Sequence, residues 1–185
     1  MTQVASRVRR AEPSDADALG RVHVRAWQAA YRGMMPDEFL DKLDPVERGR
    51  GWARALATPA PGTSRLVVCR RPQTDPVGFA GVGPARDLDE VSMGMGELYA
   101  INLEPDSWGK GLGRELLAAA TEELSRLGFD EAFLWVVTGN SRARRFYEAA
   151  GWTVDGTERT DDSFGPPIDE VRYRRRLATR HPPSR

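Results

Sequence analysis

Cysteine and histidine are nearly absent from this sequence. Cys69 is the only cysteine, so the chain cannot form an internal disulfide, as is usual in a reducing compartment. The two histidines, His23 and His181, are far apart, and no Cys/His cluster has the spacing of a zinc site. We therefore predict no disulfide framework and no metal, and we expect a cytoplasmic protein.

Long apolar runs and an excess of one charge are also missing. No stretch reaches the roughly 18 apolar residues of a membrane-spanning helix, and the first residues lack the apolar core of a signal peptide. Lys and Arg number 27, and Asp and Glu also number 27. A balanced charge disfavours a general nucleic-acid or membrane binder, so we predict neither partner.

The 185 residues, of which 40% are hydrophobic, are enough for one domain with a sizeable core. Ser14 is the expected N-cap of a first helix that Gly33 ends, and Asp44-Pro45 precedes a later one. Periodicity and turn signals predict strands at 6–10, 65–71, 75–85, 97–103, 131–137, 152–159 and 168–177, helices at 13–31, 114–127 and 140–151, and two short helices within 36–57. We predict a mixed α/β fold with one domain, 1–177, and a frayed tail, 178–185.

The stretch SWGKGLGREL places three glycines at alternate positions before the clearest helical pattern in the chain. Glycines permit unusual φ values and let a ligand approach the main chain. The amides of residues 108–113 would converge at a helix N-terminus, where the dipole favours an anion such as a pyrophosphate. A plain strand-to-helix turn is the alternative.

Two common phosphate-binding motifs do not match this loop. A P-loop needs Ser or Thr after its lysine, but Gly111 follows Lys110. A dinucleotide-binding fingerprint needs G-x-G-x-x-G directly after a strand and an acidic residue at the end of the next strand. Here the spacing is G-x-G-x-G, and Asp130 begins the next strand.

The loop and the segment NSRARRFYEAAGW together resemble the GNAT superfamily of acyl-CoA-dependent N-acetyltransferases. In that family the loop begins with Gln or Arg, where this chain has Trp108, and Gly111 and Gly113 match its glycine positions. The second segment is similar to Asn-x-x-Ala-x-x-Phe-Tyr-x-x-x-Gly-Phe, with Trp152 last. The early stretch WQAAYRGMMPDEFLDKL is also similar to bacterial members.

The resemblance implies a mostly antiparallel mixed sheet flanked by helices, with two parallel strands, 97–103 and 131–137, that splay around acetyl-CoA. It implies that main-chain amides, more than side chains, hold the phosphates, because Trp108 replaces a polar residue. The residues expected to contact acetyl-CoA are Ile101, Asn102, Leu103, Trp108, Gly109, Lys110, Gly111, Leu112, Gly113, Arg114, Asn140, Arg142 and Arg145. Asn140 could equally cap its own helix, and the cationic side chains could simply be solvated.

The implied reaction is direct transfer of the acetyl group to a primary amine through a tetrahedral intermediate. Tyr147 is the candidate acid for the departing thiolate, although it could instead pack as a half-buried core residue. Glu97 is the candidate base, since strand alternation would place it on the same face as Leu103. Alternatively, a chain of water molecules carries the proton, or Glu97 is an ordinary exposed residue without a catalytic role.

The acceptor, a small amine or a peptide, is expected to contact Trp27, Tyr31, Arg32, Met34 and Tyr99. A non-catalytic acyl-CoA sensor on the same fold and a nucleotide-binding α/β domain are the competing functions. The closing strand 168–177 could offer an edge for a homodimer. The sequence does not identify the acceptor.

Overall fold

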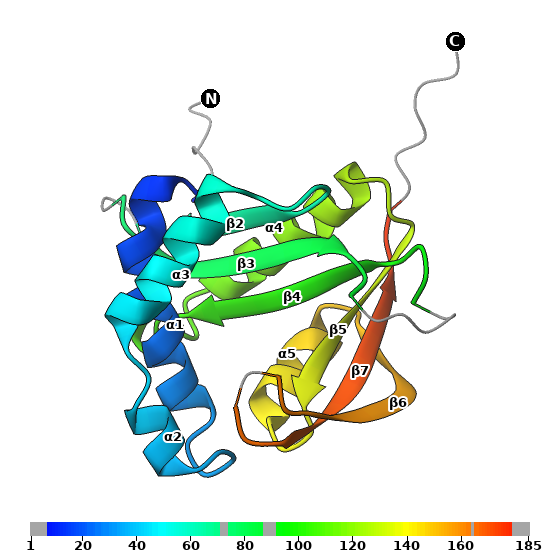
Figure 1. The fold of residues 1–185 in the computed structure, drawn as a ribbon. Helices are drawn as coiled ribbons and strands as arrows, with labels where there is room; N and C mark the ends of the chain where they lie inside the picture. Colours follow the sequence, from blue (N-terminus) through cyan, green and yellow to red (C-terminus); the bar gives the residue numbers. More distant parts are fainter. Residues whose placement is uncertain (1–6, 71–73, 87–91, 164, 179–185) are drawn as a thin grey trace.

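A seven-stranded sheet forms the centre of the protein in a computed structural model, which describes residues 7–70, 74–86, 92–163 and 165–178 (Figure 1). Its strand order is β1-β2-β3-β4-β5-β7-β6, and only the β4–β5 pair is parallel. The strands are β1 (Val8–Arg10), β2 (Ser64–Cys69), β3 (Pro76–Pro84), β4 (Gly96–Leu103), β5 (Glu131–Val137), β6 (Thr153–Asp161) and β7 (Ile168–Arg176). The predicted mixed α/β fold is confirmed.

Helices cover both faces of the sheet. They are η1 (Pro13–Asp15), α1 (Ala16–Ala30), α2 (Asp37–Asp41), α3 (Pro45–Ala57), η2 (Pro105–Ser107), α4 (Leu112–Arg126) and α5 (Ser141–Ala149). Leu19 and Val22 of α1 pack on β2 and β3 with Trp52 of α3, and Cys69 is buried in the same cluster. On the opposite face, the leucines of α4 and Tyr147 of α5 share the larger core.

The first helix begins differently from the prediction. Ser14 lies within η1 and caps neither helix, because Glu12 is the N-cap of η1 and Asp15 is the N-cap of α1. Asp15 belongs to a capping box in which its carboxylate accepts from the backbone N–H of Glu12 at 2.8 Å. The helix ends at Ala30, before Gly33. The Asp44 cap of α3 is confirmed, since its side chain accepts from the Val46 amide. Residues 71–73 and 87–91, and the predicted tail from 179 onward with His181, lie outside the described residues.

The predicted edge position of strand 168–177 is wrong. This strand, β7, pairs with β5 on one side and with β6 on the other, so its backbone is already bonded on both sides. The edge belongs to β6, whose register shifts between Val154 and Glu158, with Gly156 at φ 87°. Such irregular edges disfavour pairing with another chain.

The parallel strands β4 and β5 separate soon after they begin. They pair only at Gly96–Ala132 and Glu97–Phe133, and then diverge toward their carboxyl ends (Figure 1). This splay is the one that the family resemblance implies. Along the described residues, no helix has the length and apolar character needed to cross a bilayer. Those residues also contain no group of three or more His, Cys, Asp or Glu placed to hold a metal ion.

Candidate functional site

A cavity of about 780 Å³ lies where β4 and β5 separate. At one end, here called the loop end, its walls are the last residues of β4, the loop 107–114 and the start of α5. At the other, the hairpin end, they are α1, the turn 31–35, the first residues of β4 and the β6–β7 hairpin. Side chains from both sheet faces therefore meet in one space.

The loop end presents main-chain amides. Gly109 and Gly111 have φ values of 72° and 81°, which other residues rarely adopt, and α4 begins immediately afterwards. No described side chain caps α4 at Gly111. The amides of its first turn have no intrahelical partner, so they can bind an anion. A Cβ on either glycine would meet no atom within 4 Å, which leaves the space above them open.

Trp108 holds the loop against both neighbouring elements. Its indole N–H donates to the Leu103 carbonyl at 3.0 Å, and the Arg142 guanidinium lies 3.4 Å from its ring centroid. The tryptophan therefore binds the protein through its side chain and orients a cation at the start of α5. The sequence did not indicate this arrangement, because residues 108 and 142 are adjacent only in the folded chain.

The predicted cationic contacts separate into two groups. Arg114 and Arg142 line the cavity. Lys110 instead donates to the Asp106 carbonyl at 2.7 Å, and Lys110 and Arg145 are absent from the cavity walls. The Leu112 side chain is buried in the core beneath the loop, so only its main-chain amide is available to a ligand.

The main chain at the end of β4 faces the splay at alternate residues. The Glu104 amide donates to Val77 of β3 at 2.8 Å, and Asn102 is the register partner of Phe79. Peptide groups alternate in direction along an antiparallel strand, so those of Ile101 and Leu103 face away from β3. Of the three predicted residues, these two offer backbone groups to the cavity, and the Leu103 carbonyl already accepts from Trp108.

Tyr147 of α5 is 8% exposed and lines the cavity. Burial raises the pKa of its phenol above the ordinary value, and Tyr31 acts in the same direction. The group is therefore a neutral proton donor at physiological pH. Asn140 also lines the cavity, and its side-chain oxygen caps α5 by accepting from the Ala143 amide at 3.0 Å. The cap leaves the Asn140 amide nitrogen available as a donor.

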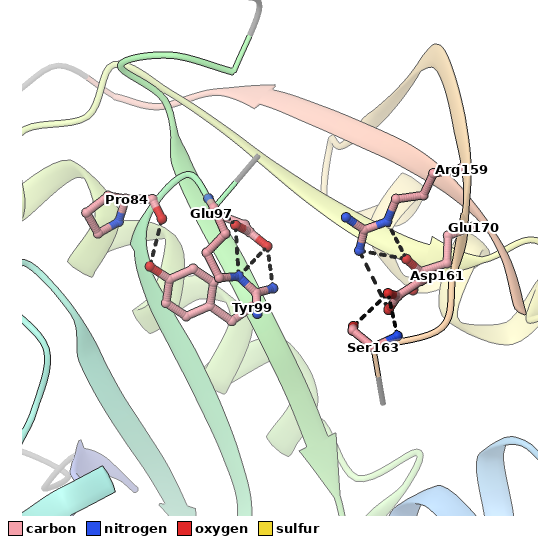
Figure 2. Close-up of polar contacts among 8 residues, drawn as sticks. Pro84, Glu97, Tyr99, Arg159, Asp161, Ser163 and Glu170 are labelled. Atoms are coloured by element: carbon pink, nitrogen blue, oxygen red, sulfur yellow. Dashed lines mark hydrogen bonds and ion pairs between the residues drawn. The ribbon is translucent and has the colours of Figure 1, made fainter. Parts of the chain in front are cut away.

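Glu97 reaches the cavity but is enclosed by an arginine. It is 1% exposed, and it accepts from the Arg86 amide at 2.8 Å and from both Nε and Nη2 of that side chain (Figure 2). Arg86 in turn stacks 4.5 Å from the centre of the Tyr99 ring, whose hydroxyl donates to the Pro84 carbonyl. Both carboxylate oxygens of Glu97 are engaged.

The expected shared face of Glu97 and Leu103 is wrong. The register shows Gly81 opposite Ala100 and Val82 opposite Leu98, so β4 contains an extra residue at this point. A bulge of this kind reverses the alternation beyond it. Leu103 consequently packs on the α4 side with the main core, whereas Glu97 lies on the other face.

A second charged group lies across the cavity, on the β6–β7 hairpin (Figure 2). Arg159 of β6 donates to Oε2 of Glu170 on β7 at 2.9 Å and stacks 4.2 Å from the Trp135 ring centroid. Asp161 accepts from the Ser163 hydroxyl and amide. Burial raises the pKa of Glu170, and Arg159 offsets this only in part.

Sequence reasoning missed this hairpin cluster. The signal available was the alternation of charged residues in TERTD and IDEVR. The strand register, which sets Arg159 opposite Glu170, was needed to read it.

The α1–α2 region closes the hairpin end. Trp27, Tyr31, Met34 and Tyr99 all line it, as expected for a binding site. Burial raises the pKa of Tyr31 to about 12, and the charge of Glu170 contributes to this shift. Arg32 points elsewhere, because it pairs with Asp37 and Asp41 of α2.

Comparisons with known proteins agree on one family. Residues 25–152 match the model of the Acetyltransferase (GNAT) family. YuaI of Bacillus subtilis (strain 168), named as an uncharacterized N-acetyltransferase, is 34% identical over 143 residues, which cover 77% of each chain. The mycothiol acetyltransferase of Mycobacteroides abscessus is 36% identical over 156 residues, or 83% of this chain and 46% of that protein.

Solved structures show the same fold. PaiA N-acetyltransferase from Thermoplasma acidophilum, determined in complex with coenzyme A, superimposes with a TM-score of 0.70 at 20% identity. The match covers 92% of this chain and 98% of that one. The chain spans less than half the length of the mycothiol acetyltransferase above, so that protein's activity is not transferred with the likeness.

Proposed function

Because this chain belongs to the acetyltransferase (GNAT) family, whose co-substrate is acetyl-CoA, we propose that its cavity holds acetyl-CoA at the loop end and an amine at the hairpin end. The chain is an N-acetyltransferase by family. One observation supports this placement of acetyl-CoA and the amine. A single cavity runs from the open amides before α4, past the separated edge of β4, to the buried phenol of Tyr147.

The residues of the loop end fit a pyrophosphate and an amide-bearing arm. The glycine loop supplies backbone donors at a helix N-terminus, and Arg114 and Arg142 supply positive charge. The main-chain N–H and C=O of Ile101 and the N–H of Leu103 would bond the pantetheine amides, with the Asn140 amide nitrogen as a further donor. The Leu103 carbonyl already accepts from Trp108. When bound, acetyl-CoA supplies an activated acetyl group on a thiol leaving group.

Tyr147 is assigned as the acid. Its raised pKa keeps the phenol protonated, and the cavity gives it access to the reacting end of the thioester. A thiolate with an ordinary pKa near 8.5 leaves more readily when a proton donor lies beside it. The acceptor is a primary amine of a small molecule or a peptide. We also propose that the enzyme acts in the cytoplasm, and the lone cysteine, a free thiol at Cys69, supports this.

The variant Tyr147→Phe tests this assignment. We expect turnover, measured as CoA thiol release over a panel of amines and peptides, to fall about a hundredfold. Acetyl-CoA affinity, measured by calorimetry, should stay unchanged because the variant keeps the ring.

Tyr173→Phe is the control, since the Tyr173 hydroxyl bonds Glu148 and Arg144 away from the cavity walls. Full turnover by Tyr147→Phe would remove Tyr147 from the mechanism. Binding of acetyl-CoA without transfer to any acceptor would favour the sensor function instead.

A further inference from the structure

Three carboxylates line the hairpin end, Glu97 on β4 and, facing it, Asp161 and Glu170 on the β6–β7 hairpin (Figure 2). Burial would raise the pKa of Asp161, but hydrogen bonds from the Ser163 hydroxyl and amide outweigh burial and lower it, so Glu97 and Glu170 are the two candidate bases. Either could receive a proton from the acceptor, so their surroundings decide between them. Glu97 accepts three donors from Arg86 that occupy both of its oxygens. Binding an ammonium there would require the displacement of an arginine, and protonation would break a bidentate ion pair.

Glu170 is held more openly. Its side chain is 13% exposed, and both described contacts from Arg159 reach the same oxygen, Oε2, at 2.9 and 2.8 Å. The other oxygen, Oε1, takes part in neither contact. A carboxylate anchored by one oxygen keeps its second available as an acceptor. Glu170 therefore combines a fixed position with an open binding atom.

The surroundings of Glu170 also favour proton uptake. Burial raises its pKa, and Asp161 acts in the same direction, while Arg159 and the more distant Arg86 oppose them. A carboxylate with a raised pKa is a stronger base than an ordinary one at the same pH. Tyr31, the C-cap residue of α1, is the remaining titratable neighbour, and its burial keeps it a neutral phenol.

Tyr31 connects Glu170 to the proposed acid. The charge of Glu170 affects the pKa of Tyr31, and Tyr31 in turn affects the pKa of Tyr147. All three side chains line the same cavity. Trp27 and Met34 line the wall beside them, which suits an apolar group attached to the amine.

We propose that Glu170, and not Glu97, binds the ammonium group of the acceptor and removes its proton, and that the acceptor carries an apolar group next to its primary amine. This inference rests on the proposed function. Glu170 takes one proton from the ammonium and later releases it to water. The neutral nitrogen adds to the thioester carbon to form the N–C bond, and the resulting tetrahedral intermediate then collapses as the C–S bond breaks. Tyr147 gives its proton to the sulfur and regains one from the nitrogen, so one proton is released in total.

Benzylamine is the probe, because it joins a primary amine to an apolar ring. Its binding to the CoA-loaded protein is measured by calorimetry, and its acetylation is measured as CoA release between pH 6 and pH 9. The variants are Glu170→Gln, Glu170→Asp and Glu97→Gln. Asp169→Asn is the charge control, since Asp169 is adjacent on β7 and bonds Thr160 away from the cavity walls.

We expect Glu170→Gln to lose benzylamine binding and at least about a hundredfold in kcat/KM, with acetyl-CoA affinity unchanged. In the wild-type protein kcat/KM should rise with pH on the acidic side of the pH profile, and this rise should disappear in Glu170→Gln. Glu170→Asp should restore part of the rate. Hydroxylamine, which is already neutral at pH 7, should lose less than tenfold. Glu97→Gln should keep most of its activity toward benzylamine.

The inference is overturned if Glu170→Gln retains the wild-type rate, if Glu97→Gln shows the same loss, or if the wild-type protein does not bind benzylamine. A different outcome would contradict the proposed function and leave this inference intact. The wild-type protein would bind both acetyl-CoA and benzylamine, and Glu170→Gln would abolish benzylamine binding, but no CoA would be released with any amine.

Discussion

At the scale of single residues, burial determines which side chains can exchange protons. His23 packs against the rings of Trp27, Trp52 and Phe79, at centroid separations of 5.3, 6.5 and 5.7 Å. Neither of its ring nitrogens has a hydrogen-bond partner among the described residues. Burial, with a contribution from Arg48, lowers its pKa to about 4. His23 is thus a neutral part of the cavity wall.

The pH dependence of stability should reveal this neutral histidine. The pKa of His23 is lower in the folded state than its ordinary value of 6.5, so the unfolded chain binds more protons between pH 6.5 and pH 4. Its contribution is fully present above pH 6.5 and is lost as the pH falls, by about 3 kcal/mol at pH 4. We expect His23→Leu to remove this part of the loss. Urea unfolding of both proteins at pH 7, 5.5 and 4 measures it, and parallel stability curves would contradict it.

At the scale of elements, the glycine loop and the two helices around it have distinct roles. Gly109 and Gly111 adopt left-handed conformations, whereas Gly113 lies inside α4 with an ordinary backbone. A Cβ on Gly113 would be in ordinary contact with Phe146 at 3.5 Å. The three glycines of the motif therefore differ, because only two of them are required by backbone geometry.

A pair of alanine substitutions separates these roles. Gly111→Ala should lower the free energy of unfolding by about 1 kcal/mol, because its φ of 81° strains any other residue. It should also weaken acetyl-CoA binding, since the new methyl enters the open space above the loop. Gly113→Ala should be neutral or slightly stabilising, as alanine favours helix. Urea unfolding and acetyl-CoA titration measure both effects. Unchanged affinity in Gly111→Ala would place the phosphates elsewhere.

At the scale of the whole molecule, the splay leaves the sheet joined across β4 and β5 by only two register pairs. Arg172 of β7 strengthens this junction. It is 3% exposed, donates to Asp155 at 2.8 Å and reaches Ser92, which precedes β4, at 2.8 Å. Its guanidinium also lies 5.5 Å from the Phe133 ring centroid. A buried cation thus ties the hairpin half to the segment that leads into β4.

Removal of that cation should destabilise the protein as a whole. Arg172→Met takes the hydrogen-bonded arginine from the partly buried Asp155 carboxylate and leaves it the looser contact with Arg174 at 3.9 Å, so we expect a loss of about 3 kcal/mol in the free energy of unfolding. The double variant Arg172→Met with Asp155→Asn should recover part of this loss, because the poorly compensated charge is gone. Urea unfolding of the three proteins provides the comparison. Equal instability of the single and double variants would show that the ion pair is not the cause.

The sequence alone determined the elements whose signals are local. The glycine loop, the leucine face of α4 and the Asn140 cap of α5 depend on residues within a turn or two of each other, and all three lie where they were expected. The glycine loop and the segment NSRARRFYEAAGW identified the family, because each motif is also local in the sequence.

Only the tertiary structure decided how distant segments meet. The bulge in β4 moved Glu97 to the face opposite Leu103, and Arg86 then enclosed it. The pairing of β7 with both β5 and β6 removed its edge and brought Glu170 to the cavity. A register shift of one residue, or a change of neighbour in a sheet, leaves no local trace in the chain. The glycine loop and the family could therefore be predicted from sequence, whereas the proposed choice between Glu97 and Glu170 required the folded protein.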